Sequence, residues 1–245
     1  MESIHELLGY KNIKIVQNSE MFCFSLDSIL LADFVNPKIG CKKIIDLGCG
    51  NAPIPLFLSL KTDAEITGVE IQKEVFELAV KSVRLNGLEA QIKIINSDIK
   101  DIYLKTGANV FDIVISNPPY FKVHPESNIN KNKYLTIARH EVMINLEGVV
   151  LEAKKLLKNG GSFYLVHRTE RLTETVNLLT ENNFGIRRMR FVYPKRENNA
   201  LLFLLEAGAN LKDDVKVESP LYVYEEGEYS QEVKEIFNFK KNEYH

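Results

Sequence analysis

From residue 43 onward, strand patterns alternate with helix patterns, and this alternation constrains the fold more than any other feature of the sequence. Short apolar runs typical of buried strands cover residues 43–46, 65–70, 91–95, 110–116 and 162–167. Helical apolar spacing covers residues 53–61, 73–85, 147–157 and 170–182. Two last strands, at 191–193 and 201–206, are close enough to form an antiparallel pair. We therefore expect an α/β fold: a doubly wound, seven-stranded, mostly parallel sheet with helices on both faces.

In such a sheet, ligands bind at the carboxyl ends of the strands, near the point where the strand order reverses. The residues at these ends are Gly48, Glu70, Asp98 and Asn117. They are the first candidates for a functional site.

The first strand runs into a glycine turn, Asp46-Leu-Gly48-Cys-Gly50-Asn-Ala52. Glycines at this position let a ligand approach the backbone closely. The dinucleotide fingerprint fails, because Pro53 stands where its third glycine would be. The acidic-x-Gly-x-Gly form instead resembles motif I of class I S-adenosylmethionine (SAM) methyltransferases. The resemblance implies a Rossmann-like fold and SAM as cofactor, with Ala52 replacing the usual third glycine.

Three acids stand at the expected strand ends. Glu70 ends the second strand, where a carboxylate can accept hydrogen bonds from both ribose hydroxyls. Asp98 resembles the family's acidic contact to the adenine amino group, and Ile71 and Ile99 could sandwich the adenine ring. Any one acid alone is explained as well by a capping role. Together with Asp46 and the glycines, they favour a SAM pocket.

The fourth strand ends in Asn117-Pro118-Pro119-Tyr120, the most informative tetrapeptide of the chain. The prolines form a rigid turn and remove two backbone donors. The Asn117 side-chain oxygen and the Pro118 carbonyl can then accept both hydrogens of an amine. This pulls the amine toward tetrahedral geometry and aims its lone pair at the methyl group. Tyr120 offers a face for a planar base to stack on.

The motif resembles that of enzymes methylating adenine N6, guanine N2, cytosine N4 or glutamine N5. Their reaction is an in-line displacement that depends on positioning and electrostatics. It requires no metal and no protein nucleophile.

Over nearly its whole length, the chain resembles the YfiC-like family of valine-tRNA adenine N6-methyltransferases. Residues 24–32, which include Asp27, look like the family segment that helps close the cofactor pocket. The other matching segments are 138–141, 166–168, 171–172, 192–195, 199–200, 220–224 and 227–229. The resemblance implies methylation of N6 of the adenine just 3′ of the anticodon. Tyr193 departs from the histidine usual at that position.

Taken over the whole chain, the net charge of −2 argues against a nucleic-acid partner. The argument changes when the charge is counted separately for the two parts of the chain. Residues 207–245 carry −4, and the remainder carries +2. Basic residues gather in 184–196 and 121–140, which we expect beside the acceptor site as a rim that attracts tRNA. The candidate RNA contacts are Lys122, Arg139, His140, Arg188, Lys195 and Arg196.

Composition sets the remaining limits. With 45% hydrophobic and 26% charged residues, the chain of 245 is typical of a soluble, cytoplasmic protein. Its three cysteines form no CxxC pair, which disfavours a disulfide framework and a zinc site. No stretch reaches the roughly 20 apolar residues that a membrane span needs. We expect an N-terminal segment 1–42 that closes the cofactor pocket, a methyltransferase domain 43–206 and a packed tail 207–245.

Several alternatives remain open. A glutamine N5-methyltransferase of release factors is weaker, because only 42 residues precede the first strand, too few for the helical domain of that family. A guanine N2-methyltransferase of rRNA often has Phe where Tyr120 stands. A DNA adenine methyltransferase usually carries an inserted recognition domain, for which there is no room. A SAM- or RNA-binding protein without activity would not need the Asn-Pro-Pro-Tyr motif. The chain could be a monomer or a homodimer.

Overall fold

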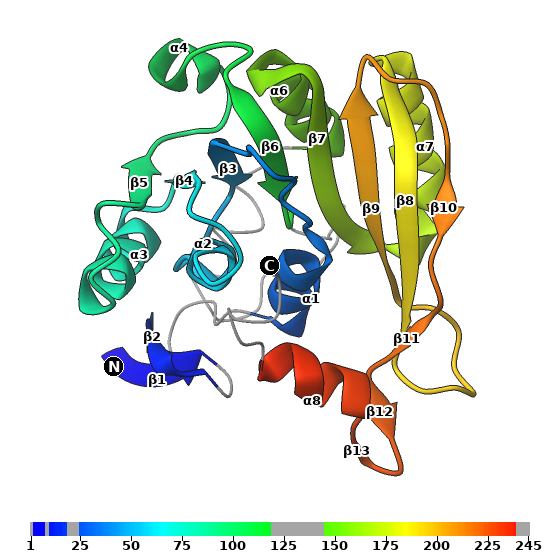
Figure 1. Cartoon of the computed structure of the whole chain (residues 1–245), viewed down its shortest axis with the longest axis horizontal. Helices are drawn as coiled ribbons and strands as arrows, with labels where there is room; N and C mark the ends of the chain where they lie inside the picture. The colour runs from blue at the N-terminus through cyan, green and yellow to red at the C-terminus, as the bar shows by residue number, and fades with distance from the viewer. Residues whose placement is uncertain (1, 8–9, 19–24, 119–144, 239–245) are drawn as a thin grey trace, which may run out of the picture.

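The computed structural model describes residues 2–7, 10–18, 25–118 and 145–238 (Figure 1). In this part of the chain, the core of the molecule is a nine-stranded sheet in the order β10-β8-β9-β7-β6-β3-β4-β5, with β11 also paired to β8. Its seven longer strands are β3 (Lys43–Leu47), β4 (Glu65–Glu70), β5 (Ile92–Asn96), β6 (Phe111–Ser116), β7 (Leu157–Arg168), β8 (Phe184–Tyr193) and β9 (Leu202–Ala209).

The predicted doubly wound sheet is confirmed. Strands β3 to β7 are parallel, and β9 is antiparallel to both of its neighbours, β7 and β8. The last two strands are longer than predicted: β8 begins at Phe184 and β9 runs to Ala209. The expected boundary at residue 206 therefore cuts through a strand. Two short strands, β10 (Lys216–Val217) and β11 (Leu221–Tyr222), lie parallel to β8 and were not predicted.

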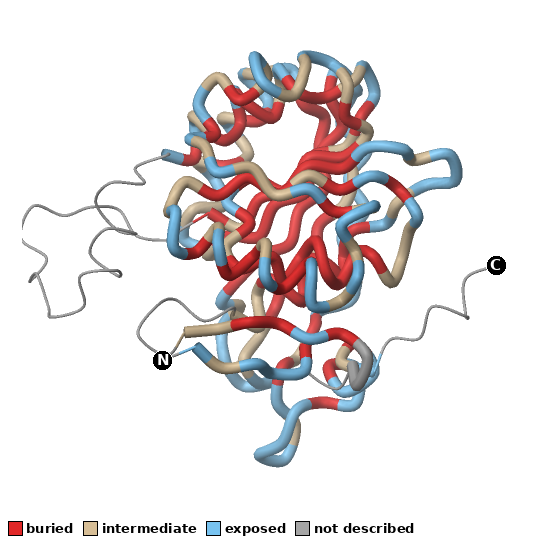
Figure 2. Tube along the Cα trace, turned by 90° about the vertical axis from the view of Figure 1, so that its left-hand side faces the viewer, coloured by how far each residue is buried: buried red, intermediate tan, exposed pale blue. Residues whose placement is uncertain are grey.

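Helices cover both faces of the sheet. Successive side chains of a strand point to opposite faces, and here both faces carry apolar side chains that the helices bury. Ile44 belongs to the apolar cluster beneath α1 (Leu26–Phe34) and α2 (Pro53–Leu58). Its neighbour Ile45 belongs to the cluster beneath α6 (Leu146–Leu156) and α7 (Leu172–Glu181). Figure 2 shows the resulting buried layer through the middle of the molecule.

The remaining helices are short or lie at the margins: α3 (Lys73–Leu85), α4 (Tyr103–Thr106), a 3-10 turn (Thr169–Arg171) and α8 (Gln231–Phe237). The helix expected over residues 53–61 ends at Leu58, and the one expected over 170–182 begins at Leu172. No helix in the described ranges combines the length and the apolar character needed to cross a membrane.

A hairpin of β1 (Glu2–Leu7) and β2 (Tyr10–Asn18) packs against α3. Side chains of α3 hold its backbone. Asn86 accepts a hydrogen bond from Lys14 N (2.8 Å) and donates to Lys14 O (2.6 Å), while Ser82 Oγ accepts from Val16 N (2.9 Å). Asn51, in the glycine turn, donates to Val16 O (2.9 Å). The hairpin is therefore tied to the loop that follows β3.

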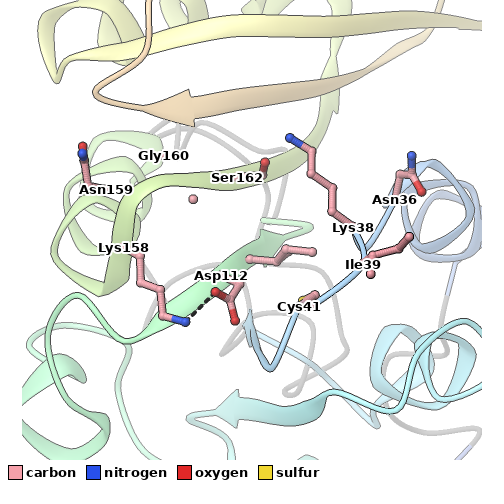
Figure 3. A pocket seen from close by; sticks show the side chains of 12 residues that line it. Asn36, Lys38, Ile39, Cys41, Asp112, Lys158, Asn159, Gly160 and Ser162 are labelled. Carbon is pink, nitrogen blue, oxygen red and sulfur yellow. Dashed lines mark hydrogen bonds and ion pairs between the residues drawn. The ribbon is translucent and has the colours of Figure 1, made fainter.

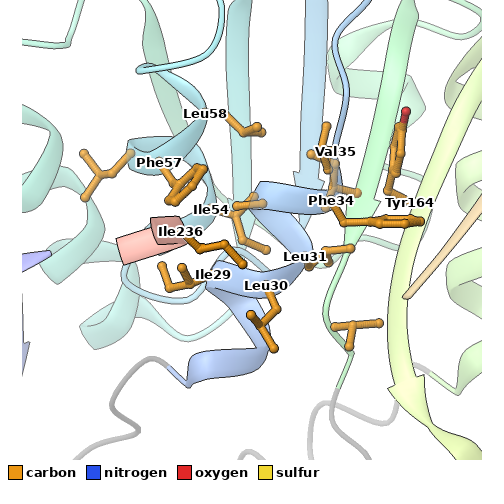
Figure 4. Close-up of a cluster of buried hydrophobic side chains, with 14 of the residues drawn as sticks. Ile29, Leu30, Leu31, Phe34, Val35, Ile54, Phe57, Leu58, Tyr164 and Ile236 are labelled. Atoms are coloured by element: carbon orange, nitrogen blue, oxygen red, sulfur yellow. The ribbon is translucent and has the colours of Figure 1, made fainter. Parts of the chain in front are cut away.

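Helix α1 is packed from several sides (Figure 4). Its Ile29 and Leu30 lie in one buried cluster with Ile54 of α2 and Ile236 of α8. At its carboxyl end, Lys61 Nζ donates to the backbone oxygens of Asp33 (2.5 Å) and Val35 (2.7 Å). Ahead of α8, the chain forms a small hairpin of β12 (Tyr224–Glu225) and β13 (Glu228–Tyr229).

Candidate active site

The ends of four parallel strands meet at one edge of the sheet. Asp46 of β3 lies between Gly68 of β4 and Ile115 of β6. The order of the strands reverses here, since β4 continues to one side of β3 while β6 lies on the other. Gly48, Glu70 and Asn117 stand at or just beyond the ends of three adjacent strands, β3, β4 and β6.

The glycine turn has a left-handed backbone at three alternate residues. Gly48, Gly50 and Ala52 have φ angles of 79°, 56° and 73°. The amides of Gly48 and Cys49 both donate to Val69 O at 2.9 Å, which fixes the turn against β4. The left-handed region favours glycine, so the backbone explains why the methyltransferase motif has a glycine where Ala52 stands.

The carboxylate of Glu70 is held by backbone amides. Its Oε2 accepts from Gly50 N (3.1 Å), and its Oε1 accepts from Gln72 N (2.8 Å). Burial raises the pKa of Glu70, and these amide hydrogen bonds oppose the rise. Each oxygen has a second lone pair, so the carboxylate can still accept from a ribose diol.

Asp46 is buried, and neither of its carboxylate oxygens has a hydrogen-bond partner among the described residues. Burial, together with the nearby charge of Glu70, raises the pKa of Asp46 to about 8. Buried polar atoms are normally paired, and the exceptions tend to mark functional sites. An orphaned carboxylate at a strand end fits a ligand that brings donors and positive charge, as SAM does. The residues present are therefore compatible with the implied cofactor.

The other predicted cofactor residues differ in their burial. Asp98 is exposed, and its Oδ1 accepts from Lys100 N (2.8 Å) in the loop after β5. Ile71 is half-buried, while Ile99 belongs to the core cluster beneath α6. Asp27 is half-buried in the first turn of α1. Their contacts to a cofactor stay predictions.

Asn117 follows β6 directly and is half-buried, and Pro118 is buried. The Asn117 amide nitrogen donates to Ser28 Oγ at 3.0 Å. The hydroxyl of Ser116 donates to Leu47 O (2.9 Å), which ties the end of β6 to the end of β3. The partner residue Ser28 was not predicted. A polar residue within the apolar run 26–34 was the available signal.

Four predicted residues lie outside the described part of the chain: Tyr120, Lys122, Arg139 and His140. Their proposed contacts stay predictions.

The structure gives the Arg188 side chain several partners within the fold. Its guanidinium forms ion pairs with Glu206 (3.0 Å) and Glu218 (3.1 Å) and stacks on the ring of Phe34 at 3.9 Å. The side chain is only 20% exposed. Side chains alternate between the two faces of a sheet along each strand, and Arg188 of β8 lies on the face that α1 covers. Its acidic partners, Glu206 and Glu218, contact it there. Its guanidinium is thus engaged by protein groups, and its proposed contact with RNA stays a prediction.

The rest of the basic segment 184–196 is also largely paired. Tail carboxylates form ion pairs with three further arginines: Arg187 with Asp214, Arg190 with Glu232, and Arg196 with Glu225. The excess negative charge of the tail therefore lies against the basic segment. Lys195 is exposed and Arg196 is 70% exposed, so these two remain candidates for RNA contact.

A cavity of about 220 Å³ lies at the opposite edge of the sheet (Figure 3). Asp112, one of its lining residues, bonds Lys158 Nζ (2.5 Å) and the amides of Lys42 and Lys43 (both 2.9 Å). These contacts join the start of β3 to β6 and β7. The cavity is thus a structural junction away from the strand ends that carry the candidate site.

The sheet topology, the glycine turn at the strand reversal and the acids at neighbouring strand ends together define a class I SAM-dependent methyltransferase. Residues 12–189 match the model of the methyltransferase small domain, and the chain belongs to this family.

Comparison with curated proteins shows which members of this class the chain is similar to. A tRNA1(Val) (adenine(37)-N6)-methyltransferase of Haemophilus influenzae strain PittEE is 31% identical over 62% of this chain and 64% of its own length. The match thus spans slightly less than two thirds of that relative. One from Porphyromonas gingivalis strain ATCC 33277, with the same name, is 30% identical over 78% of both chains. Among solved structures, a predicted O-methyltransferase of Agrobacterium tumefaciens superposes with a TM-score of 0.67 at 22% identity, covering 87% and 96% of the two chains. This last likeness concerns the fold alone.

Proposed function

We propose that this protein uses SAM to methylate N6 of adenine 37 in the anticodon loop of tRNA1(Val). The observation that carries the proposal is Asn117-Pro118 at the end of β6, beside the orphaned carboxylate of Asp46. The names of the relatives support adenine N6 over guanine N2 and glutamine N5. A SAM-binding protein without activity would not need a pair of acceptors at this place.

In the proposed reaction, Asn117 Oδ1 and the Pro118 carbonyl accept the two hydrogens of the adenine amine. The amine nitrogen is conjugated with the ring, so its lone pair is available only when the nitrogen moves out of the ring plane. Two acceptors on one side favour that geometry and orient the lone pair. SAM supplies an electrophilic methyl group: the N–C bond forms, the C–S bond breaks with its electrons returning to sulfur, and the nitrogen loses a proton to water.

For SAM, we assign roles to this chain's own residues. Glu70 accepts from the ribose hydroxyls, and Asp98 accepts from the adenine amine of the cofactor between Ile71 and Ile99. The backbone of Gly48 and Gly50 allows close approach, and Asp46 compensates the positive charge. These roles are supported by the placement of the residues at adjacent strand ends. Segment 1–42, with Asp27 in α1, closes the pocket beside the glycine turn.

The proposed partner is tRNA in the cytoplasm. The target base must leave the anticodon-loop stack, at a cost of a few kcal/mol that is small for an unpaired base. We assign contacts with the RNA backbone to Lys195 and Arg196, and the exposure of both side chains beyond the end of β8 supports this assignment.

The test is methyl transfer from labelled SAM to a panel of tRNA1(Val) transcript, the same transcript with guanine at position 37, rRNA and release factor. Only the first should become labelled, and nucleoside mass spectrometry should identify N6-methyladenosine. Asn117→Ala should lower the transfer rate at least about 100-fold while SAM still binds. Asn159→Ala, an exposed asparagine at the far edge of the sheet, is the matched control and should retain full activity.

Label in release factor alone would replace the proposal with glutamine methylation, and label in rRNA alone with guanine methylation. Loss of SAM binding in Asn117→Ala would show that this residue serves the cofactor and not the acceptor.

A further inference from the structure

We propose that Gly68 is a positioning residue for SAM, because the missing side chain at this place in β4 lets Cys49, and with it the glycine turn, lie directly against the strand. The inference deepens the cofactor half of the proposed function and rests on that function only for the place of SAM at the turn. Gly68 lies inside β4, between Asp46 of β3 and Ile94 of β5.

Space, and not backbone conformation, requires a glycine at this position. The φ angle of Gly68 lies outside the left-handed region, so other residues could adopt its strand conformation. A glycine inside a strand weakens the strand and often marks a place where another part of the chain comes close. A Cβ atom on Gly68 would lie 2.7 Å from Cys49 Sγ, 2.8 Å from Ile94 Cδ1 and 3.1 Å from Cys49 Cβ. Non-bonded heavy atoms normally keep about 3.5–4.0 Å apart, so a side chain here would displace its neighbours.

The two neighbours differ in how easily they can move. Cδ1 is the far end of the flexible Ile94 side chain, which is only half-buried. Cys49 is 3% exposed, its amide donates to Val69 O at 2.9 Å, and its Cβ moves only with the backbone of the turn. An added methyl group on Gly68 would therefore turn Ile94 aside, but it would push Cys49 and the turn away from β4.

The turn that would move provides the backbone of the proposed SAM pocket. The amides of Gly48 and Cys49 share Val69 O, and Gly50 N donates to Glu70 Oε2 at 3.1 Å. All three hydrogen bonds end on the two residues of β4 that follow the contact. Displacement of the turn would lengthen them together. It would also change the distance between the glycine backbone, which SAM approaches, and the carboxylate of Glu70, which accepts from its ribose.

The experiment compares Gly68→Ala with Gly208→Ala, the same substitution inside β9. Gly208 is a matched control because a Cβ atom there would also meet a side chain, at 2.5 Å from Leu211 Cδ1. Its strand partner Ser162 lines the cavity at the opposite edge of the sheet, away from the candidate site.

Two double variants identify which neighbour transmits the effect. One combines Gly68→Ala with Cys49→Ala, which removes the nearest atom of the turn, and the other combines it with Ile94→Val, which removes Cδ1. The single variants Cys49→Ala and Ile94→Val complete two double-mutant cycles. For each protein, the SAM affinity by calorimetry, the melting temperature and the single-turnover rate at saturating SAM and tRNA are measured.

Gly68→Ala should weaken SAM binding about 10- to 100-fold, as expected for overpacking beside a bound ligand. The KM for SAM should rise, while the single-turnover rate at saturating SAM stays within about three-fold of the wild type. Gly208→Ala should lower the melting temperature and keep the SAM affinity. In the Cys49→Ala background, Gly68→Ala should weaken SAM binding less than about three-fold, whereas in the Ile94→Val background its effect should persist in full.

SAM affinity of Gly68→Ala within about two-fold of the wild type would overturn the proposal. An equal loss in Gly208→Ala, or a rescue by Ile94→Val and not by Cys49→Ala, would do the same. If Gly68→Ala does not fold, its combination with Cys49→Ala must fold and bind SAM as Cys49→Ala does, and an unfolded double variant refutes the role of the contact.

Two results on the wild-type protein separate this inference from the proposed function. NMR should show a nuclear Overhauser effect between the α protons of Gly68 and the β protons of Cys49, and its absence would contradict the contact itself. If the wild type binds SAM but methylates no tRNA, the proposed function fails while the affinities still test Gly68. If the wild type binds no SAM, both the cofactor assignment and the positioning role fail.

Discussion

Asp46 carries the clearest signature of function at the residue scale. Its pKa is raised to about 8, against an ordinary value of 3.8, so the native protein without cofactor holds a proton that the unfolded chain releases above about pH 4. The free energy of unfolding should therefore fall as the pH rises from about 4 to about 8 and then level off. The raised pKa of Glu70 acts in the same direction.

Asp46→Asn removes this dependence. Without SAM, the variant should be more stable than the wild type at pH 8.5, by an amount on the order of several kcal/mol, and the two should converge toward about pH 4.5. Urea unfolding across this range measures the difference. Asp98→Asn is the control, since it makes the same substitution at an exposed carboxylate. Parallel profiles for the wild type and Asp46→Asn would contradict the prediction.

Individual residues also show where sequence reasoning succeeds. Glu70 and Asn117 were predictable because the ends of parallel strands meet at one edge, so their position in the sequence fixes their place in space. The partners of Ser28 and Arg188 were not. These side chains contact Asn117 and the Phe34 carbonyl, 89 and 154 residues away, and a distant partner cannot be identified from the local sequence.

At the scale of elements, the N-terminal hairpin shows what side chain–backbone contacts contribute. Asn86→Ala removes both hydrogen bonds to Lys14 and one to Ser82 O. We expect the free energy of local opening of β1–β2 to fall by about 1–3 kcal/mol. Native-state hydrogen exchange at the amides of Lys14 and Val16 measures this change.

The comparison for that variant is Lys81→Met. Lys81 joins Glu2 at 2.6 Å, but both side chains are about half exposed, so the loss should be below about 1 kcal/mol. Equal protection in the two variants would show that the asparagine does not hold the hairpin.

The strands of the hairpin and the two short strands of the tail were not predicted, for related physical reasons. In β2 the alternation of Ile13, Lys14 and Ile15 is short, and docking depends on hydrogen bonds from α3 and Asn51 to the hairpin backbone. Strands β10 and β11 are two residues each and pair through the backbone. The longer elements 65–70 and 73–85, by contrast, form with the predicted bounds, because their apolar periodicity matches the faces that they bury.

At the scale of the whole molecule, acidic side chains of the tail form ion pairs with arginines of the basic segment 184–196. Glu225→Gln should free Arg196, which is 70% exposed. We expect tighter tRNA binding at low salt, and a slope of log affinity against log salt concentration steeper by roughly one unit. Binding titrations at several salt concentrations measure the slope.

Glu226→Gln removes the same charge from the neighbouring residue, which is exposed and forms no ion pair within the described ranges. It should steepen the slope much less. Equal slopes would mean that mean charge, and not the release of Arg196, governs the effect. Net charge alone could not predict this arrangement, because the tail acids and the β8 arginines cancel only once the chain has folded.

The two short strands beside β8 also bear on how the chain is made. β10 and β11 bond to β8 through contacts such as Glu218 N to Met189 O and Val223 N to Tyr193 O, both 2.8 Å. Unpaired strand edges invite pairing with other chains. Because residues 216–223 are synthesised after β8 and β9, a nascent chain has an open edge until they emerge. Premature termination in this stretch would therefore yield a truncated chain in which the edge of β8 stays unpaired and promotes aggregation.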